Sequence, residues 1–278
     1  MASFVQLNEN VPHNSDGVDV LRHSLGQMRS VAVAFSGGAD STLLLAVAHE
    51  TLGANAIAVT MRASIFPECE TEEAIRFCRE RGISQEVMDF EPLDIPQFAE
   101  NPPDRCYYCK RTIFSKICDF ARSHGMASVV EGSNLDDDGD YRPGRKALAE
   151  LGVKSPLREA GLTKRDVRDA LKRRNITCWQ KPPAACLASR FPYGERITRD
   201  GLKHVEEAER CGAAVLPPNT PLRVRSHGDI ARIEVGANGF DSLVAHRDEI
   251  AAALKRIGFA YVALDLEDFR SGRLNDVL

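Results

Sequence analysis

The chain has 278 residues, of which 43% are hydrophobic and 27% charged, and its net charge is −4. At roughly 150 residues per domain this length predicts two domains, and the hydrophobic fraction suffices for buried cores. The acidic balance provides no overall basic field, so we do not expect a nucleic-acid partner. No apolar run is long enough to span a membrane, and the N-terminus lacks a basic region followed by an apolar stretch, so we expect a cytoplasmic protein.

The first part of the chain alternates apolar runs with helical patterns. We predict strands over 31–35, 56–61, 85–90 and 128–131, the first two of which are continuous apolar runs typical of buried strands. Helices are predicted between them, over 43–50, 72–81 and 113–121. Strands that alternate with helices predict an α/β fold with a doubly wound parallel sheet, in which ligands bind at the carboxyl ends of the strands.

A smaller α+β unit is predicted toward the C-terminus. A helix over 164–174, with Thr163 as its N-cap, precedes an irregular segment over 177–196. The elements expected beyond it are a helix, a hairpin, a second helix and a strand, over 199–210, 222–225 with 231–235, 243–256 and 261–266. We therefore predict two domains, 1–195 and 196–278, and expect the second to bind a substrate phosphate and to support a homo-oligomer.

A polar, glycine-rich loop joins the first predicted strand to the first predicted helix, with the sequence Ser36-Gly37-Gly38-Ala39-Asp40-Ser41. The glycines let the backbone approach a phosphate closely, and the first helical turn offers unpaired N–H groups to it. The hydroxyls and the carboxylate suit phosphate oxygens or a bound metal. A plain turn with a capping Asp is the alternative. The loop matches neither the Walker A pattern nor the dinucleotide fingerprint, so we predict another kind of phosphate site.

A second polar segment, residues 131–138, follows the strand predicted over 128–131. It is expected at the same edge of the sheet as the glycine-rich loop, where Gly132 and Asn134 would shape a nucleotide pocket. Asp136 and Asp137 are suited to hold Mg²⁺ through their carboxylate oxygens. A solvated acidic loop is the alternative interpretation.

Cys106 and Cys109 form a Cys-x-x-Cys pair between Arg105 and Lys110, where a helix is expected to begin. The positive neighbours and the helix N-terminus are expected to lower the pKa values of these thiols. The pair fits half of a zinc site, a redox dithiol or part of an iron–sulfur site. The remaining six of the eight cysteines offer no second close pair, as a four-cysteine zinc site requires.

Cys186 lies in a segment rich in proline, a few residues before Arg190. A small buried thiol is the plain interpretation of such a cysteine. The surrounding prolines and the nearby arginine instead favour a fixed loop that keeps a thiolate accessible.

Arg223 and Arg225 flank Val224 in the predicted hairpin, so the alternation of a strand places both guanidinium groups on one face. Two such groups suit a phosphate monoester, because each donates parallel hydrogen bonds. Arg232 and Glu234 share a face of the partner strand and are expected to orient them. An exposed charged face with cross-strand ion pairs is the alternative.

The loop at 36–41 resembles the PP-loop of the ATP pyrophosphatases, which have an adenine nucleotide alpha hydrolase-like fold and adenylate a substrate with release of pyrophosphate. Across nearly the whole chain, further motifs resemble the LarE family of ATP-dependent sulfur transferases, which make the pincer nucleotide of the nickel cofactor of lactate racemase. These motifs are Asn101-Pro102, Arg105-Cys106, Cys109-Lys110, Glu131-Gly132-Ser133-Asn134, Asp136-Asp137, Tyr141-Arg142-Pro143-Gly144 and Cys186-Leu187-Ala188-Ser189-Arg190.

The resemblance implies that ATP adenylates a carboxylate of pyridinium-3,5-biscarboxylic acid mononucleotide, and that sulfur then replaces the adenylate to leave a thiocarboxylate. It implies catalytic roles for Asp40 and Cys186, and substrate contacts for Ser189, Arg190, Arg223, Arg225 and Glu234. The residues expected to bind ATP are Ser36, Gly37, Gly38, Asp40, Ser41, Met61, Gly132 and Asn134.

Two sulfur sources follow from the resemblance. In family members with one cysteine, the residue at the position of Cys186 gives up its sulfur and becomes dehydroalanine. This chain also has Cys106 and Cys109, so it resembles the three-cysteine type, in which Cys106, Cys109 and Cys186 would hold a [4Fe–4S] cluster that carries an extra sulfide. Three other functions are alternatives, namely a PP-loop tRNA thiolase, an amidotransferase-like ligase and an ATP-binding iron–sulfur sensor without catalytic activity.

Overall fold

A four-stranded parallel sheet forms the centre of the larger part of the protein, in a computed structural model that describes residues 15–139, 141–181, 185–270 and 272–277. Its strand order is β3-β2-β1-β4, with β1 at Val31–Ala34, β2 at Ala56–Arg62, β3 at Gln85–Asp89 and β4 at Ser128–Val130. Every neighbouring pair in this sheet is parallel. The predicted parallel α/β sheet is therefore confirmed.

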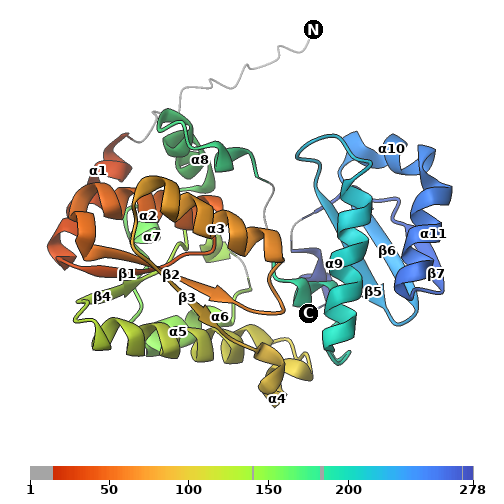
Figure 1. Ribbon diagram of the computed structural model, residues 1–278, viewed down its shortest axis with the longest axis horizontal. Helices are drawn as coiled ribbons and strands as arrows, with labels where there is room; N and C mark the ends of the chain where they lie inside the picture. Colours follow the sequence, from red (N-terminus) through yellow and green to blue (C-terminus); the bar gives the residue numbers. More distant parts are fainter. Residues whose placement is uncertain (1–14, 140, 182–184, 271, 278) are drawn as a thin grey trace, which may run out of the picture.

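Helices cover both faces of this sheet (Figure 1). One face carries α1 (Ser15–Met28), α2 (Ala39–Leu52), α3 (Glu68–Arg81), α7 (Pro156–Glu159) and α8 (Lys164–Arg173), and the other carries α5 (Arg105–Ser123) and α6 (Gly144–Glu150). The central strand β1 is apolar throughout because both of its faces are buried: Val31 and Val33 belong to the core under α2, whereas Ala32 belongs to the core under α5.

Two of the predicted helices illustrate how the local sequence determines the element. In α5 the apolar positions recur at helical spacing and all of them are buried, namely Ile113, Phe114, Ile117, Phe120 and Ala121. At the start of α8 the Thr163 side chain accepts a hydrogen bond from the Asp166 backbone N–H, and the Asp166 carboxylate accepts one from the Thr163 N–H in return. Helix α1 and the short helix α4 (Pro96–Ala99) were not predicted.

The smaller part contains a three-stranded sheet in the order β5-β6-β7 (Leu222–His227, Ile230–Val235, Tyr261–Leu264). Strands β5 and β6 form the predicted antiparallel hairpin, and β7 pairs with β6 in parallel. Helices α9 (Arg199–Ala213), α10 (Phe240–Ala245) and α11 (Arg247–Ile257) complete this part. The single helix predicted over 243–256 is wrong, because His246 leaves the helical conformation at ψ 16° and its Nδ1 lies 2.8 Å from the Ser242 carbonyl oxygen.

The two sheets are connected through a common core. The apolar cluster under α5 continues through Phe191 and Ile197 to Val205 of α9 and Val224 of β5. The domain boundary predicted near residue 195 falls within this connection and stays a prediction. Among the residues that the structure describes, no helix is long and apolar enough to cross a membrane.

Candidate active site

The loop after β1 turns sharply into α2 and leaves the start of that helix open. Gly37 adopts the left-handed φ of 77°, and a Cβ at this position would lie 3.4 Å from both the Ala74 Cβ and the Glu70 carbonyl oxygen of α3. Gly38 is the N-cap of α2 and supplies no side-chain hydrogen bond. The first N–H groups of α2 thus lie at the carboxyl edge of the sheet, where they are suited to an anion.

Two serine hydroxyls meet inside this loop. Ser41 Oγ donates to the Gly38 carbonyl oxygen at 3.2 Å and lies 3.2 Å from Ser36 Oγ. The backbone N–H of Ser36 donates in turn to Ser41 Oγ. The structure therefore brings together the glycines and hydroxyls that the sequence placed in one phosphate site.

The segment after β4 packs directly against the start of α2. Asn134 is fully buried, and its Nδ2 donates to Asp40 Oδ1 at 2.9 Å. A Cβ on Gly132 would lie only 2.9 Å from the Ser41 backbone nitrogen, so this position accepts no side chain without movement. Met61 is buried in β2 within the core on the α5 side, and its contact with ATP stays a prediction.

The acidic residues after β4 are held by positive groups. Asp137 is buried, and its Oδ1 lies 2.7 Å from Arg142 Nη2 and 3.3 Å from Lys164 Nζ. Asp136 accepts a hydrogen bond from the Lys164 backbone N–H at 2.8 Å. Within the described residues, no group of three or more metal-ligating side chains is gathered around one point. The assignment of Mg²⁺ to Asp136 and Asp137 stays a prediction. The contacts of Lys164 with these two carboxylates were not predicted, because Lys164 lies far along the chain.

The surroundings of Asp40 shift the pKa of its carboxyl group, with burial as the largest effect. Desolvation raises the pKa of the Asp40 carboxyl, the hydrogen bond from Asn134 lowers it, and the nearby charge of Asp137 raises it further. The positive charges of Lys164 and Arg142 lower the same pKa. A cationic ligand at this carboxylate would therefore be favourable.

The three predicted sulfur residues lie on two distant segments and influence one another electrostatically, but within the described residues they do not form a group that could hold a metal ion. Cys106 is exposed and Cys109 buried at the start of α5, whereas Cys186 directly precedes the short 3-10 helix η5 (Leu187–Arg190). Burial raises the pKa of Cys109 well above its usual range, and the Cys186 and Cys106 thiols raise it further. Burial also raises the pKa of Cys186 to about 11, with Cys106 adding to the effect. The thiols thus lie within electrostatic reach of one another.

The expectation of a lowered thiol pKa is wrong for Cys109, and the raised pKa of Cys186 disfavours the thiolate that was expected in its loop. Arg105 does lower both pKa values, helped by Lys110 at Cys109 and by Arg190 at Cys186. Desolvation outweighs these positive charges, because an apolar environment disfavours the charged thiolate. Sequence neighbours reveal the charges near a thiol but not its burial.

Arg190 fixes the Cys186 loop to the smaller sheet. Its guanidinium binds the Glu209 carboxylate through two hydrogen bonds of 2.7 and 2.9 Å, and also donates to the Ala185 carbonyl at 2.8 Å. Glu209 Oε1 accepts a further hydrogen bond from the Val224 backbone N–H of β5. The geometry therefore gives Arg190 a positioning role, and its predicted contact with substrate stays a prediction.

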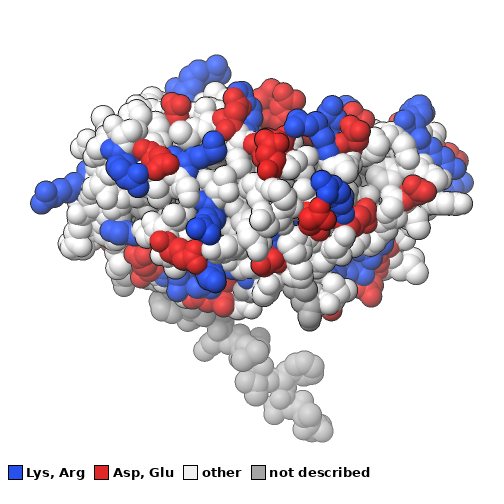
Figure 2. Space-filling model, turned by 90° about the horizontal axis from the view of Figure 1, so that it is seen from below, with Lys and Arg blue, Asp and Glu red and all other residues white. Residues whose placement is uncertain are grey.

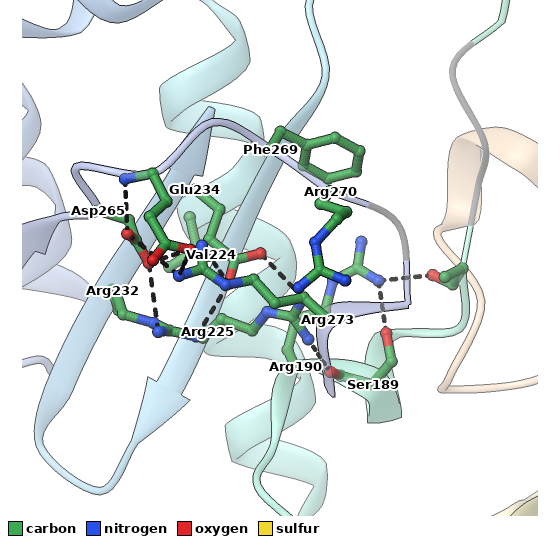
Figure 3. A network of polar contacts seen from close by, with 12 residues as sticks. Ser189, Arg190, Val224, Arg225, Arg232, Glu234, Asp265, Phe269, Arg270 and Arg273 are labelled. Carbon is green, nitrogen blue, oxygen red and sulfur yellow. Dashed lines mark hydrogen bonds and ion pairs between the residues drawn. The ribbon is translucent and has the colours of Figure 1, made fainter. Parts of the chain in front are cut away.

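The hairpin places Arg223 and Arg225 on one buried face, as predicted. Figure 3 shows Arg225 beside Arg232 and Glu234 of the partner strand. Arg225 donates to Glu234 at 2.9 Å and to the Ser189 carbonyl at 2.7 Å, and Arg232 donates to the other oxygen of Glu234. Asp265 pairs with both Arg232 and Arg273, so that the C-terminal segment closes this network. Glu234 is fully buried, so the face is not exposed as the alternative had it, whereas the cross-strand ion pair of that alternative is present between Arg225 and Glu234.

Arg223 differs from its neighbours on this face. It is 4% exposed, and within the described residues it forms neither a hydrogen bond nor an ion pair through its side chain, although its guanidinium lies 4.9 Å from the centre of the Phe269 ring. Burial together with the charges of Arg190 and Arg225 lowers the pKa of Arg223 to about 10. The charges of Glu209 and Glu234 act in the opposite direction. A buried guanidinium without an ion pair of its own is suited to an anionic group of a substrate.

The charge elsewhere on the surface is mixed. Figure 2 shows positive and negative side chains interspersed over one whole face of the molecule, with neither sign dominating. A groove between α3, α5 and α9 contains none of the predicted site residues and is likewise lined by both signs, as Arg62, Lys203, Glu72 and Glu91 illustrate.

A parallel sheet whose first strand runs into this open phosphate loop defines a nucleotide-binding protein of the PP-loop class. The profile of the NAD synthase family matches residues 16–102, which include β1, the loop and α2. The chain is 38% identical to the pyridinium-3,5-bisthiocarboxylic acid mononucleotide synthase of Lactiplantibacillus plantarum, over 92% of each protein. It therefore belongs to the LarE family, as the sequence motifs predict.

Two further relatives differ in how much of this chain they resemble. An uncharacterised protein of Synechocystis is 38% identical over 93% of this chain and 96% of its own length. The NH₃-dependent NAD⁺ synthetase of Wolinella succinogenes is 32% identical over 31% of this chain and 34% of its own length. The likeness to the NAD⁺ synthetase is thus local, whereas the likeness to the LarE family covers nearly the whole chain.

The contact between Gly132 and α2 yields a prediction about ATP binding. Gly132→Ala should weaken ATP binding by about tenfold or more, because the added Cβ must displace the start of α2 from its phosphate-binding position. Isothermal titration with ATP measures the effect. Gly139→Ala is the matched control, since a Cβ there meets nothing within 4 Å. Equal affinities in the two variants would contradict the role assigned to this contact.

The raised pKa of Asp40 yields a prediction about stability. A folded-state pKa above the unfolded value of 3.8 means that the native protein binds the proton more tightly, so ionisation at neutral pH costs stability. Asp40→Asn should therefore raise the free energy of unfolding at neutral pH, and this gain should shrink as the pH falls below the raised pKa. Urea unfolding of both proteins, measured from neutral pH to below the raised pKa, checks this difference in the free energy of unfolding. Asp119→Asn, at an exposed ion pair with Arg122, serves as control and should show no such gain.

Proposed function

We propose that this protein is an ATP-dependent sulfur transferase that acts on pyridinium-3,5-biscarboxylic acid mononucleotide. It would adenylate a carboxylate of this substrate and convert it to a thiocarboxylate, as a step in making the nickel-pincer nucleotide of lactate racemase. The observation that carries the proposal is the hydrogen bond from Arg225 to the Ser189 carbonyl, which joins a buried arginine face to the loop of Cys186 in a chain whose helix α2 starts open after the glycine-rich loop. Full-length similarity to the synthase of L. plantarum supports it.

The first step activates the carboxylate. The N–H groups at the start of α2, with Ser36 and Ser41, would bind the β- and γ-phosphates of ATP. An oxygen of the substrate carboxylate then attacks the α-phosphorus, the bond from that phosphorus to the bridging oxygen breaks, and pyrophosphate leaves. Mg²⁺ accompanying ATP would be held by oxygen ligands near the loop, for which Asp40 and Asp136 are suited; it would offset the charge that develops on the phosphates.

The second step replaces the adenylate by sulfur. A sulfur nucleophile attacks the activated carbonyl carbon, a C–S bond forms, and the C–O bond to AMP breaks. If Cys186 is the donor, a thioester forms, and loss of its Cα proton with cleavage of the Cβ–S bond leaves the thiocarboxylate and dehydroalanine. The alternative donor is a [4Fe–4S] cluster, which Cys106, Cys109 and Cys186 would hold and which would supply an iron open to sulfide. Within the described residues, these three cysteines are not gathered as a group that could hold a metal ion.

The buried arginine face would hold the phosphate of the substrate. Arg223 and Arg225 lie on it together, and Arg225 also donates to the Ser189 carbonyl in the loop that carries Cys186. A phosphate bound to this face would therefore place the rest of the substrate near the thiols. Glu234 would hold Arg225 in position, because its carboxylate is shared between Arg225 and Arg232.

Arg223→Gln should raise the KM for the mononucleotide by about tenfold or more, since a charge-assisted hydrogen bond is lost, and should leave ATP affinity unchanged. Steady-state pyrophosphate release, measured at varied substrate, determines this KM. Arg256→Gln is the control, because Arg256 lies exposed on α11 in the same part of the protein. An unchanged KM in Arg223→Gln would place the substrate phosphate elsewhere.

A direct assay tests the reaction itself. Protein purified without oxygen is mixed with ATP and the mononucleotide, and we expect pyrophosphate, AMP and a product in which sulfur replaces oxygen. Absence of substrate-dependent pyrophosphate would overturn the proposed function. The mass of the peptide that contains Cys186 identifies the sulfur donor. Loss of H₂S from this peptide after one turnover assigns the sulfur to Cys186, whereas an intact cysteine in iron-containing protein assigns it to the cluster.

A further inference from the structure

The buried arginine face gathers like charges that its carboxylates balance only in part. Arg225 and Arg232 are direct partners in the register of the hairpin, so two arginines stand opposite each other. Like charges in such cross-strand positions destabilise a sheet unless other groups compensate for them. The compensating carboxylates are Glu234, which is fully buried, and Asp265, whose side chain is 11% exposed. A further guanidinium, from outside the hairpin, lies close to both of these carboxylates.

Arg273 provides this guanidinium from a position near the end of the chain. Its Nη1 lies 3.0 Å from Asp265 Oδ2 and 4.0 Å from Glu234 Oε1 (Figure 3). Arg232 binds the same two oxygens, at 3.2 and 2.9 Å. A second partner of Arg273, Glu267, is 74% exposed, so water screens this ion pair. Arg273 and Arg232 therefore share the two buried carboxylates.

Contacts on both sides of Arg273 along the chain hold it at this place. Before it, the Phe269 N–H donates to the Val235 carbonyl of β6 at 3.2 Å. After it, Asn275 Oδ1 accepts a hydrogen bond of 2.8 Å from Tyr193 Oη. The guanidinium of Arg273 is thus anchored to the smaller sheet and to the loop that follows Arg190.

The shared carboxylates leave positive charge over for a ligand. Apart from the pair of Arg190 with Glu209, four arginines of this face meet two mostly buried carboxylates among the described residues. These arginines are Arg223, Arg225, Arg232 and Arg273. Within the same part of the chain, Arg225 Nε is buried without a hydrogen-bond partner. A phosphate monoester carries about two negative charges at neutral pH, which this excess of positive charge matches.

We propose that Arg273 is a positioning residue for the phosphate of the substrate. It shares both carboxylates with Arg232, so that Arg223 and Arg225 keep their charge available to the phosphate. This inference rests on the proposed function and adds to it a residue that lies outside the hairpin. Without Arg273, the arginines of the hairpin alone would balance both carboxylates, and the positive excess would fall by one charge.

Binding of the mononucleotide in the absence of ATP tests this role in the full-length protein. Arg273→Gln should raise the Kd of the mononucleotide by about tenfold in isothermal titration, because the phosphate meets one positive charge fewer. The corresponding nucleoside, which lacks the phosphate, should bind to this variant as it does to the wild type. Arg273→Lys should restore most of the affinity, since it keeps the charge. Arg247→Gln is the matched control, because Arg247 is 71% exposed on α11.

A second substitution tests the charge balance itself. Asp265→Asn removes one negative charge from the same network, so it should lower the Kd of the mononucleotide below the wild-type value. Combined with Arg273→Gln, it should bring the Kd about threefold or more below that of Arg273→Gln alone. A purely structural role predicts the opposite, because the second substitution would then add to the damage. Asp265→Asn on its own decides the question if Arg273→Gln does not fold.

Three results would overturn the role of Arg273. The first is a Kd of the mononucleotide in Arg273→Gln that equals that of the Arg247→Gln control. The second is an equal loss of affinity for nucleoside and mononucleotide, and the third is weaker binding of the mononucleotide by Asp265→Asn. Failure of the proposed function is recognised separately. In that case the wild type releases no pyrophosphate in response to the mononucleotide, whereas the comparison of mononucleotide with nucleoside still reports on the phosphate.

Discussion

The Glu209 carboxylate links the two halves of the candidate active site. It binds the Arg190 guanidinium through both oxygens, and Arg190 in turn holds the carbonyl oxygens around Cys186. Because α9 carries Glu209 and packs on β5, the position of the cysteine loop is tied to the position of the arginine face. Breaking one partner of such a buried pair leaves an unpaired charge, which is far more costly than the net contribution of the pair.

The charges of the site fall into two groups. Several of its arginines are neutralised within the protein, as Arg190 is by Glu209 and Arg225 by Glu234. Arg223 is buried without an ion pair among the described residues, and Asp40 is a half-buried carboxylate with a raised pKa. Such groups reduce the stability of the empty protein, and they coincide with the places where a substrate phosphate and a metal-bound nucleotide are expected.

Local patterns in the sequence predicted the elements that depend on local interactions. The apolar spacing from Ile113 to Ala121 and the capping residue Thr163 predicted helices that the structure contains, and the glycines at 37 and 38 marked the turn into α2 correctly. The alternation of Arg223 and Arg225 predicted their common face. In each case the deciding interaction lies within a few residues along the chain.

Features that depend on tertiary packing were predicted poorly. The pKa shift of Cys109 has the opposite sign to the expectation, because burial of a thiol depends on elements far away in sequence. The partner of Arg190 lies 19 residues further on, in a helix whose facing side the sequence alone did not orient.

The hydrogen bond from Val224 to Glu209 also has a consequence for association between molecules. Strand β5 is the outer strand of the smaller sheet, and an outer strand exposes backbone groups that pair readily with strands of other chains. Because the Glu209 side chain of α9 already accepts the hydrogen bond of the Val224 N–H, one backbone donor of this edge is not available to a strand of another chain. Pairing of a second molecule along β5 would have to displace that carboxylate.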